Sequence, residues 1–133
     1  MPDVIVIGDI NVDVNFVIPA YPSPGNEAVA TAVQMNTGGS AVNTAIALAK
    51  MERDVGFIGR VGRDTLAQQV LDDLSKTGVD CTHIQIDPKV STGMIFIAVS
   101  ADGERTMFGA RGANAFTEAS ALAPEYFLNC RWL

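Results

Sequence analysis

The apolar positions along the chain form continuous runs at first and strict alternation afterwards. Residues 4–8 are an unbroken β-branched run that ends in glycine, which is typical of a strand buried on both faces of a parallel sheet. From Val12 to Val17 the apolar residues alternate with Asp13 and Asn15, and this period of two predicts a half-exposed strand. We therefore expect the two neighbouring strands to lie in different environments.

Two helical patterns follow, separated by another buried strand. Apolar residues from Val42 to Ala49 recur at i, i+3, i+4 and i+7, and Ser40 is the expected N-cap of this helix. A second helix is predicted from Asp64 to Lys76, with Gly78 just past its end. The segment from Asp54 to Val61 between them has the pattern of a buried strand, and the alternation of strand and helix predicts an α/β fold.

Beyond the second helix the period returns to two. Short strands are predicted at His83–Asp87, Gly93–Ser100 and Glu104–Gly109, the last two joined by a tight hairpin turn at Asp102-Gly103. We expect these strands to lie outside the alternation of strand and helix. The prediction is a small accessory sheet that is interleaved with the α/β layer and made of residues 12–17, 28–35, 92–99 and 105–109.

The end of the sequence predicts an unfinished strand. Thr117–Phe127 has the pattern of a short helix interrupted at Pro124, and Cys130–Leu133 has the pattern of the first residues of a strand. An apolar strand needs neighbours to pair with. We therefore expect the natural domain to continue beyond Leu133.

Composition and charge exclude several classes of function. The 133 residues are 48% hydrophobic and 18% charged, which predicts a compact globular protein. A net charge of −6, with nine scattered lysines and arginines, argues against nucleic acid as a partner. No apolar run approaches the roughly 20 residues of a membrane span, and Met1-Pro2-Asp3 lacks the basic start of a signal peptide, so the expected location is cytoplasmic. Cys81, Cys130 and the single His83 have no metal-ligand spacing, and we expect no metal site among them.

A pair of glycines opens the first predicted helix, in the run from Thr37 to Ala45. Glycine lets a ligand approach the backbone, and the first turn of a helix offers free N–H groups to oxygen-rich ligands. An ordinary loop before an N-cap explains the pattern equally well. Neither the G-x-G-x-x-G fingerprint after the first strand nor the G-x-x-x-x-G-K-[ST] phosphate loop is present.

Five segments taken together resemble the ribokinase-like (PfkB) family of carbohydrate kinases. They are Gly8–Asp13, Pro24–Glu27, Gly38–Ala45, Gly59–Asp64 and Gly112–Asn114. The resemblance implies a parallel sheet flanked by helices and covered by a small β-sheet lid, for which the accessory strands are the candidates. One position departs from the family's pattern, because Glu52 stands where that signature usually has glycine or serine, at the end of the first helix.

The resemblance also implies a reaction and a set of substrate contacts. Members transfer the γ-phosphoryl group of ATP, with Mg²⁺, to a hydroxyl of a sugar or nucleoside. By resemblance, the hydroxyls are bound by Asn11 and Asp13 together with Gly38, Gly39 and Asn43. The residue chemistry agrees, because a carboxylate accepts hydrogen bonds from adjacent hydroxyls and an amide both donates and accepts. A solvated strand residue for Asp13 and a satisfied amide at a helix start for Asn43 are the alternatives.

Three further positions are candidates with open alternatives. Ile95 and Ile97 fall where lid strands of the family place apolar side chains over the sugar, and core packing explains them equally well. Arg111 either faces the pocket or is solvated. The substrate itself stays open among ribose, fructose, ketodeoxygluconate and a nucleoside.

The catalytic part of the family's signature has no match in these residues. The family's catalytic aspartate lies in a Gly-Ala-Gly-Asp motif further along the chain, and no such motif occurs here. We therefore expect a chain truncated before the ATP-binding half, without kinase turnover of its own. The alternative is a catalytically inactive module that binds sugar or forms a homodimer through its lid strands.

Overall fold

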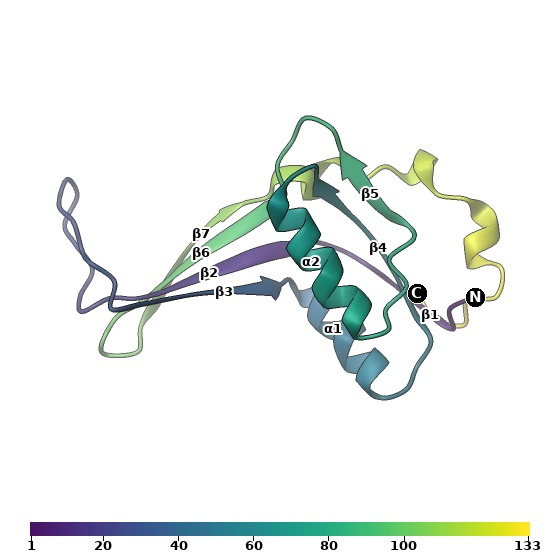
Figure 1. Cartoon of the computed structure of the whole chain (residues 1–133), viewed down its shortest axis with the longest axis horizontal. Coiled ribbons are helices and arrows are strands. Elements are labelled where there is room, and N and C mark those ends of the chain that lie inside the picture. Colours follow the sequence, from purple (N-terminus) through teal and green to yellow (C-terminus); the bar gives the residue numbers. More distant parts are fainter.

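Residues 1–133 are all described by a computed structural model. Figure 1 shows two sheets: a helix-packed α/β layer, and a lid that extends away from it. The α/β layer contains the parallel strands β1 (Val4–Ile7), β4 (Val55–Gly62) and β5 (Ile84–Asp87), in the order β1-β4-β5. The helices α1 (Ser40–Lys50) and α2 (Thr65–Lys76) pack against the central strand β4. The expected class, a parallel sheet with helices and a second sheet, is confirmed.

The two faces of β4 belong to two separate cores. Val55, Phe57 and Val61 are fully buried in one cluster with apolar residues of α1 and α2. Ile58 points to the other face, where it packs with Ile5 and Tyr126. Burying each of these large side chains contributes about 1.5–3 kcal/mol. The continuous apolar run of β4 is therefore explained by burial on both faces.

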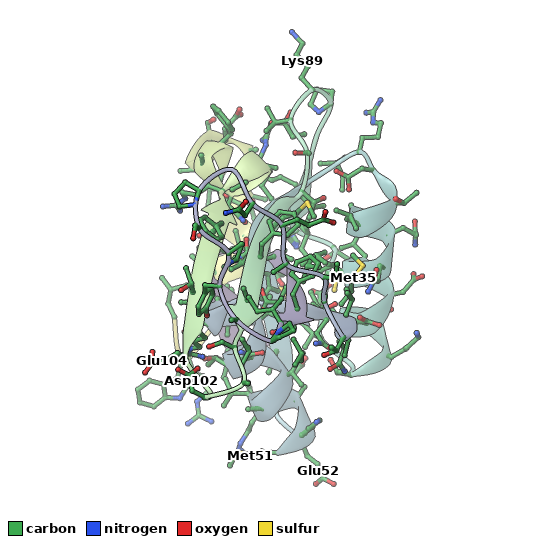
Figure 2. All side chains as sticks on the ribbon, turned by 90° about the vertical axis from the view of Figure 1, so that its left-hand side faces the viewer. Met35, Met51, Glu52, Lys89, Asp102 and Glu104 are labelled. Carbon is green, nitrogen blue, oxygen red and sulfur yellow. The ribbon has the colours of Figure 1, made fainter.

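The lid is a mixed four-stranded sheet in the order β3-β2-β6-β7. Its strands are β2 (Asn11–Val17), β3 (Ala32–Gly38), β6 (Gly93–Val99) and β7 (Arg105–Ala110). The central strands β2 and β6 run parallel, and each outer strand pairs antiparallel with its neighbour. In Figure 2, which looks along the lid, Met35 of β3 and the hairpin residues Asp102 and Glu104 lie toward opposite edges of that sheet.

The alternation in β2 separates two faces of the lid. Val12 and Val14 are buried in the main core, and Phe16 stacks on Phe96 with ring centroids 6.2 Å apart. Asn11 and Asp13 lie on the opposite face, which we call the inner face. The register places Asp13 beside Ile95 of β6 and Asn36 of β3.

Two expectations about strands are wrong. The strand predicted at residues 83–87 belongs to the α/β layer, because β5 pairs parallel with β4. The strand predicted at residues 28–35 begins at Ala32 and continues to Gly38, because its partner β2 spans Asn11–Val17 and offers no residue to pair with earlier ones. The pairing partner, rather than the local hydrophobic pattern, thus determines which sheet β5 joins and where β3 begins and ends.

Two expectations about helices need correction. Gly39, not Ser40, is the N-cap of α1, and no side chain caps this end. The segment 117–127 forms 3-10 turns instead of an interrupted helix, and Pro124 starts the last of them, η3 (Pro124–Phe127). Proline is tolerated there because the first helical N–H has no partner in any case.

Two other features follow the sequence. Glu52 adopts φ 60 after α1, so a residue that is not glycine takes the left-handed conformation there. Trp132 forms a parallel bridge to Val4 at the edge of β1, where the last residues were expected to begin a strand. None of the helices has the length and apolar character that crossing a membrane requires.

Candidate functional site

Two adjoining hollows lie where the inner face of the lid meets the first turn of α1. The lid cavity, of about 730 Å³, is lined by Asp13, Asn43 and Arg105, among others. The strand-end cavity, of about 570 Å³, is lined by Asp9 and Asn11 at the end of β1 and start of β2. Both hollows are lined by Gly39, Ser40, Thr44 and Ile95. One continuous polar surface therefore runs from Asn11 to Asn43.

Asp13 holds the least satisfied polar atom of this surface. Its Oδ1 is buried and has no hydrogen-bond partner in the chain. Burial raises the pKa of this carboxyl above its ordinary value of 3.8. A buried acceptor without a partner costs about 1–3 kcal/mol, so this arrangement is typical of a group whose partner is a ligand.

Gly38 provides the space for that carboxylate. A Cβ added at Gly38 would collide with Oδ2, Oδ1 and Cγ of Asp13. The first glycine of the pair therefore accommodates a neighbouring side chain. Room for the Asp13 carboxylate is thus a second reason for a glycine here, beside the expected access of a ligand to the backbone.

Gly39 is required by its conformation. Its φ is 114, and an added Cβ would lie 2.5 Å from the carbonyl oxygen of Asp9. Most side chains do not tolerate that backbone region. The chain can therefore turn from β3 into α1 close to the end of β1, which brings the two cavities together.

Asn11 presents its amide to the strand-end cavity. Its Oδ1 accepts a hydrogen bond of 2.9 Å from Nδ2 of Asn114, and the Asn11 residue is only 7% exposed. No hydrogen bond within the chain uses its Nδ2. The free part of Asn11 is therefore a donor, on the same face of β2 as the free acceptor on Asp13.

The helix residues of the site lie in the first turn of α1. Asn43 is exposed, lines the lid cavity, and donates its backbone N–H to Gly39 over 3.0 Å. The hydroxyl of Thr44 donates to the Ser40 carbonyl oxygen over 3.0 Å. The Asn43 side chain has no partner in the chain, so it can both donate to and accept from a ligand.

The two predicted isoleucines have different positions. Ile95 lines both cavities, opposite Asp13 in the strand register. Ile97 lies two residues further along the same inner face, opposite Asn15 and Met107, and lines neither cavity. The structure therefore brings Ile95, but not Ile97, to the polar surface.

Arg111 forms an ion pair with Asp9. Its Nη2 lies 3.1 Å from both carboxylate oxygens of Asp9, and its side chain is 70% exposed. An exposed ion pair of this kind contributes about 0–1 kcal/mol. Arg111 thus reaches the strand-end cavity only through Asp9.

The lining or supporting residues that were not predicted include Asp9, Arg105 and Asn114. Asp9 directly follows the glycine that ends β1, so its place at a strand end was available from the sequence. Arg105 lies on the inner face because the turn at Asp102-Gly103 sets the register of β7. Asn114 acts across 103 positions of the sequence, and no local pattern signals such a contact.

The chain belongs to the pfkB family of carbohydrate kinases, whose family model matches residues 1–130. A ribokinase of Staphylococcus aureus (strain COL) is 33% identical over 129 residues, which are 96% of this chain and 41% of that protein. The structure of Arabidopsis thaliana ribokinase complexed with ribose and ATP matches with a TM-score of 0.79 at 27% identity, over 85% of this chain and 37% of that one.

A third relative shows the shared fold. Ribokinase from Thermotoga maritima has a TM-score of 0.88 at 23% identity, over 98% of this chain and 43% of that one. The chain thus spans between 37% and 43% of the length of these three proteins.

Kinases of this family use ATP, and the family's Gly-Ala-Gly-Asp motif has no match among these residues. No group of three or more histidine, cysteine, aspartate or glutamate side chains comes together to hold a metal. The two cavities offer one unpaired carboxylate, amides and an ion-paired Asp9. This donor set suits hydroxyl groups.

Proposed function

We propose that this chain forms the sugar-binding part of an ATP-dependent carbohydrate kinase that phosphorylates a hydroxyl of a sugar or nucleoside. The observation that carries the proposal is the buried, unpartnered Oδ1 of Asp13 in a cavity shared with the first turn of α1. Names of relatives support it, because they include ribokinase, deoxyribokinase and an ATP-dependent ribose-1-phosphate kinase.

Each polar residue has a role in this proposal. Asp13 accepts hydrogen bonds from two neighbouring hydroxyls, Asn11 donates one through Nδ2, and Asn43 closes the other side from the helix. Gly38 and Gly39 leave room for this arrangement, and Ile95 covers the apolar face of the ring. Arg111 holds Asp9 at the rim, and Ile97 packs within the lid.

Calorimetric titration tests the binding part of the proposal. D-ribose, 2-deoxy-D-ribose, D-fructose and adenosine are titrated separately into the 133-residue chain. We expect saturable binding of at least one of them, weakened about tenfold or more by Asn43→Ala, because one charge-free hydrogen-bonding group is lost. Asn129→Ala, at an exposed position that lines neither cavity, is the matched control and leaves binding unchanged. No binding of any of the four compounds would contradict the proposal.

We further propose that the 133-residue chain gives no kinase turnover on its own. Catalysis of phosphoryl transfer consists almost entirely of positioning and charge stabilisation around the γ-phosphoryl group, and the residues present do not build that part. A coupled ATP assay with the same four compounds tests this, and ordinary turnover would overturn it.

A second proposal concerns the outer face of the lid, opposite Asp13. Val33, Met35, Phe96 and Phe108 lie on this face and are between 37% and 65% exposed. Because β3 and β7 are also unpaired edges, we propose that two copies associate through their lids. Sedimentation equilibrium should show a dimer that Phe108→Lys weakens about tenfold or more. Ile86→Lys on β5, also at an exposed apolar residue, should not weaken it, and a wild-type monomer at all concentrations would refute the proposal.

A further inference from the structure

Asn114 contacts the proposed sugar site from behind. It lies in the 3-10 turn η1 (Gly112–Phe116), immediately after the last lid strand, and is only 6% exposed. Its side chain forms three hydrogen bonds with Ile10 and Asn11, which lie more than 100 positions earlier. All the hydrogen bonds that this amide makes therefore converge on the start of β2.

Two of these bonds fix the orientation of Asn114 itself. Its Oδ1 accepts from the backbone N–H of Ile10 over 2.8 Å, and its Nδ2 donates to the carbonyl oxygen of Ile10 over 3.0 Å. A backbone N–H can only donate and a carbonyl can only accept, so the amide cannot be turned over without losing both bonds. The second N–H of Nδ2 is then the only group left to face Asn11.

This arrangement determines what Asn11 offers to a ligand. Asn11 must present its oxygen to Asn114, over 2.9 Å, so its Nδ2 is turned to the other side. On that side it lies 3.8 Å from the position that a Cβ on Gly39 would take, and it lines the strand-end cavity. A donor on Asn11 thereby lies on the same face of β2 as the acceptor on Asp13, two residues earlier in the strand.

Close packing leaves the pair little freedom. A Cβ added at Gly93, on β6, would collide with both Nδ2 of Asn114 and Oδ1 of Asn11. Gly93 and both asparagines are buried. The hydrogen bond between the two amides is thus enclosed by the strand beside it, and neither side chain can rotate away without breaking contacts.

We propose that Asn114 is a positioning residue of the site: it holds the amide of Asn11 so that only N–H groups face the strand-end cavity. The consequence for ligand binding rests on the proposed sugar-binding function. In that case the site combines a fixed donor on Asn11 with the acceptor on Asp13, and so selects a ligand with adjacent hydroxyls. The orientation of Asn11 is a property of the chain without ligand and is measurable separately.

The first test is nuclear magnetic resonance of the wild-type chain without ligand. The side-chain NH₂ protons of Asn11 should show nuclear Overhauser effects to the α-protons of Gly39. They should show none of the strength expected for direct contact with the Asn114 NH₂ group. Contact between the two NH₂ groups, or an NH₂ group of Asn11 averaged between orientations, would overturn the proposal without any variant.

The second test is a double-mutant cycle with D-ribose as the probe. Asn114→Asp still accepts from Ile10 but cannot donate, so the Asn11 amide should turn its NH₂ group toward the new carboxylate and present oxygen to the cavity. We expect about tenfold weaker D-ribose binding in Asn114→Asp, and less than about twofold further change when Asn114→Asp is added to Asn11→Ala. Circular dichroism checks that each variant is folded.

The outcomes separate the two claims. Additive losses of D-ribose affinity in the cycle would show that Asn114 acts independently of Asn11 and would overturn the positioning role. Absence of D-ribose binding by the wild-type chain counts against ribose as the ligand of the proposed function, while the nuclear Overhauser effects still decide how Asn11 is held.

Discussion

The carboxylates of Asp13, in the lid cavity, and Asp64, at the start of α2, have opposite hydrogen-bonding environments. Asp64 accepts hydrogen bonds from Ala67 N, from Thr92 N and from the Thr92 hydroxyl, at 2.7–2.8 Å. Burial alone would raise the pKa of Asp64, but these hydrogen bonds lower it overall. Around Asp13 there is only burial, and the pKa of that carboxyl is raised.

The difference separates a structural carboxylate from a binding one. Asp64 caps α2 and ties it to the base of the lid strand β6, where the Thr92 hydroxyl also accepts from Gly62 N over 3.0 Å. Both carboxylate oxygens of Asp64 thus accept hydrogen bonds from other groups of the chain. Asp13 lies next to Gly38, and its Oδ1 accepts no hydrogen bond from the chain. This acceptor is therefore available to a ligand.

Removing the satisfied carboxylate should have the largest effect. Asp64→Ala removes the cap of α2 and leaves the N–H and hydroxyl groups of Thr92 without their acceptor. We expect the free energy of unfolding to fall by about 2–3 kcal/mol, measured by urea denaturation followed by circular dichroism. Asp72→Ala, on the exposed face of the same helix, loses one hydrogen bond to Gln68 and should stay within about 0.5 kcal/mol of wild type. Equal midpoints for the two variants would mean that Asp64 contributes no more to stability than an exposed carboxylate on the same helix.

Neutralising the unsatisfied carboxylate should have a smaller effect of opposite sign. Asp13→Asn removes a charge that burial penalises, so we expect the free energy of unfolding to rise by about 1 kcal/mol at pH 7. The same change should weaken binding of the proposed sugar ligand at least tenfold, because the amide cannot accept hydrogen bonds through both of its terminal atoms.

Asp13→Asn is informative only through the combination of the two measurements. Denaturation and calorimetry are carried out on the same preparation, with Asn129→Ala as a variant expected to change neither. A loss of stability in Asp13→Asn would show that the fold itself uses this carboxylate, and the comparison with Asp64 would fail.

Elements set by local pattern were predictable from the sequence, and elements set by distant partners were not. The helix α2, with its Asp64 cap and Gly78 after its end, lies where the period of 3.6 predicts. The strand β5 begins one residue after its predicted start and ends at the predicted Asp87, but its pairing with β4 depends on how the intervening helix packs. The same holds for β3, whose limits are those of its partner β2.

The residues of the candidate site divide in the same way. The resemblance to the family, with which the residue chemistry agrees, identified Asn11, Asp13 and Asn43 as candidates. Asn114 hydrogen-bonds Asn11 from the turn η1, which follows the last lid strand in the sequence and lies beside the start of β2. Arg105 enters the lid cavity through the register of a hairpin. Both depend on pairing that exists only in the folded chain.

The smallest expected effect is the difference between Asp13 and Asp64 in how stability depends on pH. The pKa of Asp64 lies below the ordinary 3.8, so the unfolded chain takes up its proton first, and the stability that Asp64 contributes is complete above about pH 4 and lost as the pH falls further. The pKa of Asp13 lies above 3.8, so the folded chain takes up that proton first, and the penalty of its charge is relieved as the pH falls toward 4.

The free energy of unfolding of the wild type, relative to that of Asp13→Asn, should therefore rise by less than about 1 kcal/mol as the pH falls from 7 to 4. Relative to Asp64→Asn, the wild type should lose stability only below about pH 4. Parallel curves for both variants across the whole range would mean that the two carboxylates have equivalent surroundings in the folded chain.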